Sequence, residues 1–248
     1  TQSTSRRQRQ MCIRDSPLTS PWTDFSNFGF SIGAATMDLP DDAALGAGAG
    51  VWLTDQTYLL GGVFDLNSDP NHPFDGFDTF FNDREYFTAV EIGWTNSPWE
   101  AYFIDNLHLT LWHADARKKL GVDSGWGALL SYNKTIGDKW MVFARAGHAE
   151  DGASLLENSI SVGGGYTPDG IKNFGAGSQL GFGAHWGQPN DNLFGADLNE
   201  QNALEAYYRI QVTKELAITP DVQLLINPAL NPNHNSAWVF GLRARYAF

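Results

Sequence analysis

From residue 43 onward the chain consists of short segments rich in Val, Ile, Leu, Tyr, Trp and Gly, separated by turn-rich spacers. Runs of this length and composition are typical of β-strands. None carries the 3.6-residue apolar period of an amphipathic helix, so we expect helices only as short pieces in loops. The pattern predicts eleven strands: Leu45–Thr54, Thr57–Asp65, Glu85–Trp94, Asn106–Ala114, Ser124–Asn133, Lys139–His148, Asn158–Thr167, Gly175–Trp186, Asn202–Val212, Leu216–Ile226 and Ala237–Phe248.

Within these segments apolar and polar residues alternate, as expected when successive side chains of a strand point to opposite faces. In the last segment every even-numbered residue from Trp238 to Phe248 is apolar or aromatic, whereas Arg243 and Arg245 lie on the odd-numbered face. Three earlier segments near the C-terminus divide in the same way. We therefore expect one face of the sheet to be apolar and the other to carry the charges.

The spacers alternate between short turns and long loops. Residues 55–56 and 213–215 are short and 66–84 and 187–201 are long, although two spacers in the middle of the chain blur the pattern. This arrangement is typical of outer-membrane barrels. The expected fold class is all-β: an antiparallel up-and-down transmembrane β-barrel with short periplasmic turns, long outer loops and a periplasmic C-terminus. Residues 29–33 (GFSIG) are predicted as part of a further strand or as a loop folded inward.

Composition excludes several other classes of protein. With 42% apolar and 13% aromatic residues, the chain is not intrinsically disordered. One cysteine excludes a disulfide framework and a multi-cysteine zinc site. No run approaches the roughly 18 consecutive apolar residues of a membrane helix. Charged residues make up only 18% of the chain, against about 25% in an ordinary soluble domain.

The formal net charge of −12 argues against a nucleic-acid partner, which needs a basic face. Residues 1–16 differ from the rest, since they hold four arginines and Cys12 but no aromatic residue. This stretch resembles a translated sequencing adaptor, so we expect an artefact or a disordered segment and treat 17–248 as an incomplete barrel. Without those four arginines and Asp15, the formal charge is −15.

A soluble β-sandwich or barrel is the commoner alternative, with its apolar face in a core and its polar face in water. Three features favour the membrane instead. The polar faces are poor in lysine, and the chain ends in an aromatic residue within an apolar stripe. Aromatic residues also lie near predicted strand ends, as in an interfacial girdle: Trp94, Trp126, Tyr132, Trp140, Tyr166, Trp186, Trp238 and Tyr246.

Strand number adds an expectation about completeness. Single-chain bacterial barrels have an even number of strands, and every strand edge in lipid must be paired. Eleven strands do not satisfy this condition. We therefore expect residues 17–248 to be the C-terminal portion of a longer barrel.

The closing residues resemble the C-terminal signature of the carbohydrate-selective porin family OprB. The strongest part is 205–248, with 205–209 (EAYYR), 218–228 (ITPDVQLLINP), 238–245 (WVFGLRAR) and terminal Phe248. Weaker matches follow in order upstream: 61–65 (GGVFD) with 67–70, 91–94 (EIGW), 112–115 (WHAD) and 143–147 (FARAG).

The resemblance implies a Gram-negative outer-membrane barrel that admits sugars by passive diffusion, with about eleven of an expected sixteen strands present here. It implies no chemistry and no cofactor, so the chain is not expected to be an enzyme. The last strand resembles the signal that the outer-membrane assembly machinery reads, through Phe248, Tyr246, Leu242 and Phe240. The expected partners are small-molecule sugars, the lipid bilayer and that machinery, with no nucleic acid.

A sugar pore needs weak binding at several sites, from aromatic faces and from groups that bind hydroxyls. The alternative role for the same side chains is a cross-strand ion network that stiffens the wall. The residues predicted to line the lumen are Arg145, Arg209, Arg243, Arg245, Glu205, Asp221, Gln223, Glu91 and Trp112.

Other candidate chemistry is weaker. Oxygen-bearing residues alternate from Asp65 to Asn71 as at the start of a calcium loop, but Pro70 stands where glycine is needed and Gly76 where glutamate is needed, which favours a solvated outer loop. The histidines lack metal-ligand spacing, and no nucleophile motif frames any serine.

Two alternative functions stay open: a soluble carbohydrate-binding β domain, and an outer-membrane β-barrel hydrolase with Ser and His on neighbouring strands at the lipid face. The sequence also leaves open the sugar, the ion selectivity and whether the protein is a monomer or a trimer.

Overall fold

The computed structural model describes residues 18, 24–31, 33–40, 44–69, 71–97, 104–170, 177–231 and 233–247. Eleven strands dominate this part of the chain: β1 (Gly46–Trp52), β2 (Thr57–Asp65), β3 (Tyr86–Thr95), β4 (Asn106–Ala114), β5 (Gly125–Ile136), β6 (Trp140–Asp151), β7 (Leu156–Tyr166), β8 (Gln179–Pro189), β9 (Gln201–Gln211), β10 (Leu216–Ile226) and β11 (Ser236–Tyr246). Residues 1–16, expected to be an artefact or a disordered segment, and Phe248 lie outside the described residues.

Helical pieces are short and lie outside the strands: η2 (Phe28–Phe30), η3 (Ala34–Thr36), η4 (Pro73–Asp75), α1 (Gly76–Asp78), η5 (Thr79–Asp83) and α2 (Asp191–Phe194). Within the described residues, no helix has the length and hydropathy needed to cross a membrane.

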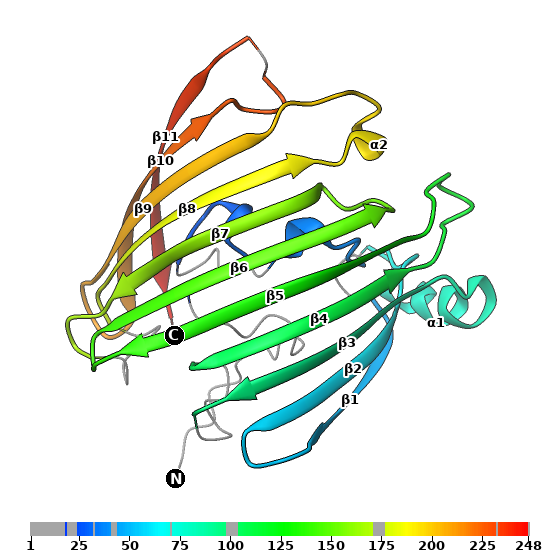
Figure 1. The fold of residues 1–248 in the computed structure, drawn as a ribbon, viewed down its shortest axis with the longest axis horizontal. Coiled ribbons are helices and arrows are strands. Elements are labelled where there is room, and N and C mark those ends of the chain that lie inside the picture. The colour runs from blue at the N-terminus through cyan, green and yellow to red at the C-terminus, as the bar shows by residue number, and fades with distance from the viewer. Residues whose placement is uncertain are drawn as a thin grey trace.

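Each strand pairs antiparallel with the next, giving one sheet in the order β1 to β11. Figure 1 shows this sheet as a strongly curved wall, with the long loops and α1 and α2 at one end of the strands. The predicted eleven up-and-down strands are confirmed, with bounds within a few residues. β5 extends further than predicted, to Ile136, because a tight turn containing Gly137, at a φ of 62°, lets its pairing with β6 continue to the turn. β6 extends further at its other end, to Asp151, which pairs with Gly125. In the described chain the sheet does not close, and β1 and β11 form its two edges.

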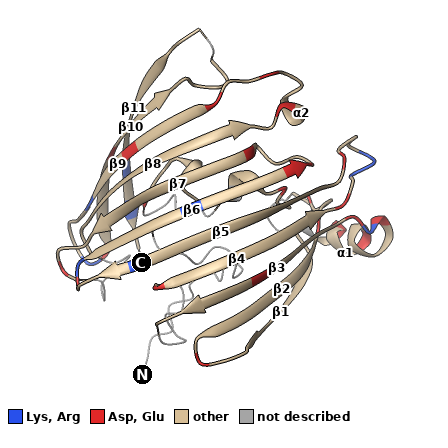
Figure 2. Cartoon of the chain, in the orientation of Figure 1, with Lys and Arg blue, Asp and Glu red and all other residues tan. Residues whose placement is uncertain are grey.

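The sheet has inverted polarity relative to a soluble protein, because its outer face exposes apolar side chains while its inner face buries polar ones beside two apolar clusters. On the convex face, apolar side chains are exposed, as at Val90 (53%), Leu111 (53%) and Phe240 (78%). On the concave face, polar side chains are buried, as at Glu91 (3%) and Arg209 (1%). Figure 2 shows that most charged residues lie in the loops and at strand ends, with few along the strands.

Residues 24–40 cover part of the concave face, which explains why polar side chains there are buried. Of the two predictions for 29–33, the inward-folded loop is right for the residues described. Gly29 and Phe30 lie in the 3₁₀ turn η2, which contacts β7 and β8, and the next turn, η3, contacts β6 and β7 (Figure 1). Phe25 and Phe30 stack with their ring centroids 4.5 Å apart. Phe25 also meets the edges of Phe143 on β6 and Tyr207 on β9.

Glycine allows one of these aromatic residues to lie flat against the wall. A Cβ at Gly181 on β8 would lie 2.2 Å from the ring of Tyr207 on β9. Since no real Cβ comes so close, any larger residue at this position would push Tyr207 out of its contact with Phe25. The aromatic cluster under residues 24–30 therefore depends on this glycine.

A charge on the convex face should destabilise the protein if that face meets lipid. Leu109 lies mid-strand on β4, with its side chain 39% exposed on the convex face. We expect Leu109→Arg to lower the free energy of unfolding by roughly 2–4 kcal/mol in lipid vesicles, and Thr88→Arg, near the outer end of β3, by about 0–1 kcal/mol. Urea unfolding in vesicles measures both values. Equal values for the two variants would contradict a lipid-facing convex side.

The turn before β4 carries an acid whose ionisation stabilises the fold. The carboxylate of Asp105 accepts hydrogen bonds from Nζ of Lys134 (2.8 Å) and the backbone N–H of Thr135 (2.7 Å). Partial burial opposes ionisation, but these hydrogen bonds outweigh it and hold the pKa of Asp105 below its ordinary value of 3.8.

Because the folded-state pKa of Asp105 is depressed, its stabilising contribution is complete above the unfolded-state pKa and is lost as pH falls through the folded-state pKa. We expect Asp105→Asn to be less stable than the parent at pH 7 and to lose less stability on acidification below pH 3.8. Urea midpoints measured from neutral to acidic pH test this. Parallel curves for parent and variant would show that Asp105 has no such role.

Candidate functional site

The concave face carries a row of polar side chains that follows the strand register. His108 pairs with Ser131, Ser131 with Arg145, Arg145 with Ser161, and Ser161 with His185, across β4 to β8. Because directly paired residues of antiparallel strands share a face, the register alone brings all five together. All five are buried.

The inward segment is held to β9 and β10 through its backbone. Glu205 accepts hydrogen bonds from the backbone N–H groups of Ser26 (2.6 Å) and Asn27 (3.0 Å). The hydroxyl of Ser26 also lies 3.2 Å from Asp221 Oδ1, and Gln223 Nε2 donates to that hydroxyl at 2.7 Å. Charge-assisted bonds from two backbone N–H groups offset part of the cost of burying the Glu205 carboxylate.

Three of the predicted arginines also bind main-chain oxygens. Arg145 donates to the carbonyl of Phe30, and its guanidinium lies 4.1 Å from the ring centre of Phe143. Arg209 donates through Nε to the carbonyl of Gly177 (2.9 Å), with Nη1 3.6 Å from the Asp24 carboxylate. Arg243 donates to the carbonyl of Asp24.

The remaining predicted residues lie in different surroundings. Glu91 accepts hydrogen bonds from the hydroxyls of Tyr58 and Thr110, both at 2.9 Å. Trp112 is buried and stacks on Phe87 with centroids 5.9 Å apart. Arg245 is exposed at the edge strand β11.

All nine predicted residues thus lie on the concave face, but the wall does not gather them into one cross-strand ion network. Among the described residues, Glu205 and Asp221 receive their hydrogen bonds from the segment and Gln223 rather than from the arginines. The polar wall and residues 24–31 together form the site.

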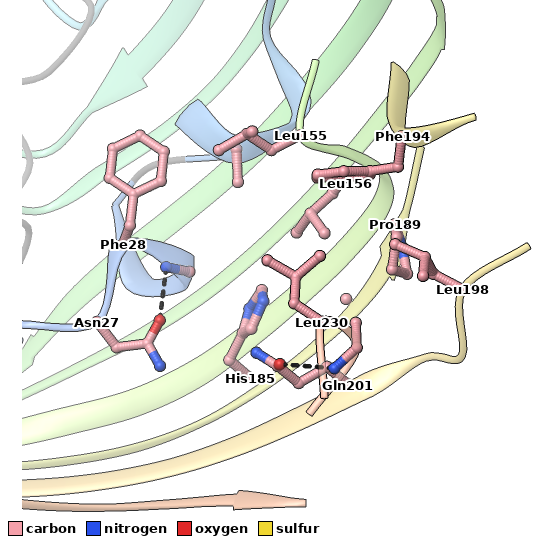
Figure 3. A pocket seen from close by; sticks show the side chains of 14 residues that line it. Asn27, Phe28, Leu155, Leu156, His185, Pro189, Phe194, Leu198, Gln201 and Leu230 are labelled. Atoms are coloured by element: carbon pink, nitrogen blue, oxygen red, sulfur yellow. Dashed lines mark hydrogen bonds between the residues drawn. The ribbon is translucent and has the colours of Figure 1, made fainter. Parts of the chain in front are cut away.

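A pocket of about 240 Å³ opens where this segment meets the outer loops. Figure 3 shows Phe28, Leu155, Phe194, Leu198 and Leu230 around it. Polar groups lie on one side: Asn27, His185 and Gln201, whose Oε1 accepts from the backbone N–H of Ala229 (3.1 Å). An apolar wall with a few polar groups is the usual composition of a small-molecule site.

Sequence reasoning missed this pocket and the anchors of the segment. Asn27, His185 and Gln201 come from the segment, β8 and β9, and no sequence spacing links them. Strand parity assigns His185 and Gln201 to the concave face, which is the one signal available before the structure.

An ion pair holds the far end of the segment to the outer loops. Nη2 of Arg117, in the loop between β4 and β5, lies 2.7 and 2.8 Å from the two carboxylate oxygens of Asp38. The backbone N–H of Ala153 donates to the same carboxylate at 3.1 Å. Asp38 and Arg117 are only 3% and 11% exposed, so the pair is shielded from water.

The candidate calcium loop uses its oxygens internally. Asp65 accepts from the backbone N–H of Asn67 and from the hydroxyl of Thr79, while Asp69 accepts from the N–H of Asn71 and contacts His72 at 2.8 Å. In the described part of the chain, no group of three or more His, Cys, Asp or Glu residues is placed to hold a metal ion.

Serine and histidine do meet on neighbouring strands, but on the concave face. Ser161 Oγ lies 2.9 Å from His185 Nδ1 and donates to the carbonyl of Gly29. Among the described residues, no carboxylate contacts His185 to orient it, as a hydrolytic triad requires.

Comparison with known proteins agrees with this architecture. The model of one protein family, described as carbohydrate-selective porin, OprB family, matches residues 118–248. No curated protein sequence matches the chain significantly.

Two solved structures share the fold at low sequence identity. The high-pH structure of Pseudomonas putida OprB is 15% identical, with a TM-score of 0.58 over 82% of this chain and 58% of that one. The outer-membrane channel DcaP of Acinetobacter baumannii is 12% identical, with a TM-score of 0.57 over 95% of this chain and 70% of that one. The chain thus spans 58% of the length of the first of these proteins.

Breaking the Asp38 pair should loosen the inward segment. We expect Arg117→Ala to lower the free energy of unfolding by about 3–5 kcal/mol, because it leaves a buried carboxylate without its cation. The same substitution should speed hydrogen exchange at residues 33–38. Lys119→Ala is the matched control, since its pair with Asp83 lies in the same loop but Lys119 is 70% exposed. The control should leave the free energy of unfolding almost unchanged, because water screens its exposed ion pair. Equal exchange at residues 33–38 in both variants would show that the pair does not anchor the segment.

Proposed function

The chain belongs to the OprB family of carbohydrate-selective porins, and we propose that it forms part of the wall of an outer-membrane channel through which sugars diffuse passively. Its concave face lines the water-filled path, and residues 24–40 narrow that path from within. The channel carries out no covalent chemistry. Small ions share the same path.

The inverted polarity of the two faces is the observation that carries this proposal. Exposed Leu111 and Phe240 on the convex face would be unfavourable in water, whereas lipid accepts them. Buried Glu91 and Arg209 on the concave face would be unfavourable in a dry core without partners. A soluble carbohydrate-binding domain requires the opposite arrangement.

The pocket beside residues 27–29 is the proposed docking point at the outer mouth. Phe28 and Leu230 offer apolar surface to the C–H face of a sugar ring, and the amide of Gln201 offers hydrogen bonds to its hydroxyls. Because few polar groups line the pocket, binding is weak enough for release.

Beyond the pocket, the path passes the concave wall. Gln223, Arg243 and Arg245 are its more exposed polar groups, and we assign them direct contact with sugars. The buried members of the predicted set shape the path by holding the segment and the wall: Arg145, Arg209, Glu205, Asp221, Glu91 and Trp112.

Two further expectations belong to this proposal. The exposed convex residues Phe240, Leu242 and Tyr246 of β11, with Phe248, serve as the signal for the outer-membrane assembly machinery. The open edges β1 and β11 pair with further strands of a larger barrel, monomeric or trimeric.

Removing the amide in the pocket should weaken sugar binding. We expect Gln201→Leu to weaken the block of single-channel current by a neutral sugar about fivefold, the equivalent of one hydrogen bond of about 1 kcal/mol. Gln188→Leu makes the same change on the convex face of β8, where Gln188 contacts Asn158 and Glu157. This control should leave the block unchanged.

Two outcomes would contradict the proposal. If the parent protein in planar bilayers passes no current that neutral sugars reduce, the channel function is wrong. If sugar block is present but equal in Gln201→Leu and Gln188→Leu, the channel stands and the pocket is not its docking point.

A further inference from the structure

The long outer loop between β2 and β3 carries an apolar surface that the channel wall does not use. Its helical segment Pro73–Asp83, made of η4, α1 and η5, is called here the rim helix. Phe74, Phe77 and Phe81 on it are 84%, 58% and 60% exposed. Spacings of three and four residues place the three rings on one side of a helix. Large exposed apolar patches usually mark an interaction site.

The register shows which side of the wall the rim helix occupies. Along β3 the concave residues are buried and the convex residues exposed, and Tyr86 has convex parity, one residue before buried Phe87. Asp65 pairs directly with Tyr86, so it has the same parity. Both residues therefore stand on the convex, apolar side of the wall.

The rim helix docks on these two residues. The Tyr86 hydroxyl donates to the carbonyl of Phe80 at 2.7 Å, and the two rings lie 5.0 Å apart. The hydroxyl of Thr79 donates to the Asp65 carboxylate. The contacts fix the rim helix at the outer end of β2 and β3, and Figure 1 shows α1 at that end of the sheet.

We propose that the rim helix lies in the outer leaflet of the membrane at its polar interface, with Phe74, Phe77 and Phe81 among the lipids. The inference rests on the proposed function, which sets the convex face in lipid. The argument for a lipid occupant is continuity, because the patch extends the exposed apolar face of β3 through Tyr86. Short helices with aromatic residues on one side bind membrane interfaces in this way.

The charges on the rim helix indicate which lipid surface suits it. Asp83 is neutralised by Lys119 at 2.7 Å, whereas Asp75 and Asp78 add two negative charges beside the aromatic patch, against one positive charge from Arg84 at the C-cap. Anionic headgroups would repel these two carboxylates. Zwitterionic phosphatidylcholine vesicles are therefore the appropriate probe.

Three single-cysteine variants in a Cys12→Ser background test the inference, each labelled with an environment-sensitive fluorophore in phosphatidylcholine vesicles. Phe77→Cys reports on the rim helix. Leu230→Cys is the matched control, since Leu230 is 75% exposed on another outer loop but lines the pocket on the concave side. Leu109→Cys reports on the lipid-facing wall.

We expect the emission from position 77 to shift to shorter wavelength and to be quenched by lipids carrying a nitroxide near the headgroup, while position 230 responds only to aqueous iodide. If position 77 behaves like position 230, the inference is overturned. It is also overturned if position 77 is shielded from both quenchers, either by another part of the chain or by a second copy, which cross-linking distinguishes. Lipids carrying a nitroxide deep in the acyl chain test position 109, which lies mid-strand on β4. If position 109 escapes that quencher, the membrane placement itself is wrong and the proposed function fails with it.

Discussion

Continuous antiparallel pairing from β1 to β11 is the constraint on which the other features of the structure depend. A slip of one residue would turn every side chain of a strand to the opposite face. In this sheet such a slip would bring Leu109 and Leu111 to the concave side and turn Thr110, the partner of Glu91, and Trp112 to the convex side. A register irregularity does occur between Leu156 and Asn158, at the outer end of β7, where it leaves the rest of the strand in place.

The concave face illustrates how buried polar groups are accommodated. A wall of buried Glu, Asp and Arg residues requires hydrogen-bond partners. Residues 24–31 supply many of them from the main chain, through the N–H groups of Ser26 and Asn27 and the carbonyl of Phe30. The segment is thus held by polar contacts and by the Phe25–Phe30 stack together. Wall and segment form one unit, so a substitution in either changes the same concave surface.

The end of the sheet that carries the long loops presents a different surface on each of its two sides. On the concave side the loops frame an apolar pocket beside Gln201, and on the convex side the rim helix presents its phenylalanines. Strand parity separates these two surfaces, since Tyr86 and Phe87 are neighbours in sequence but point to opposite faces. Loops at one end of the sheet can therefore present separate surfaces on its two sides.

The sequence by itself determined the eleven strands, the up-and-down order and the assignment of each side chain to a face, because the period of two is a local property of every strand. It also placed residues such as Arg145 and Glu205 on the concave side. Only the tertiary structure decided what these residues contact. Ser26 lies 179 positions from Glu205, and Arg145 lies 115 positions from Phe30. Such contacts follow from how the segment folds back into the curved sheet, and no local pattern encodes that path.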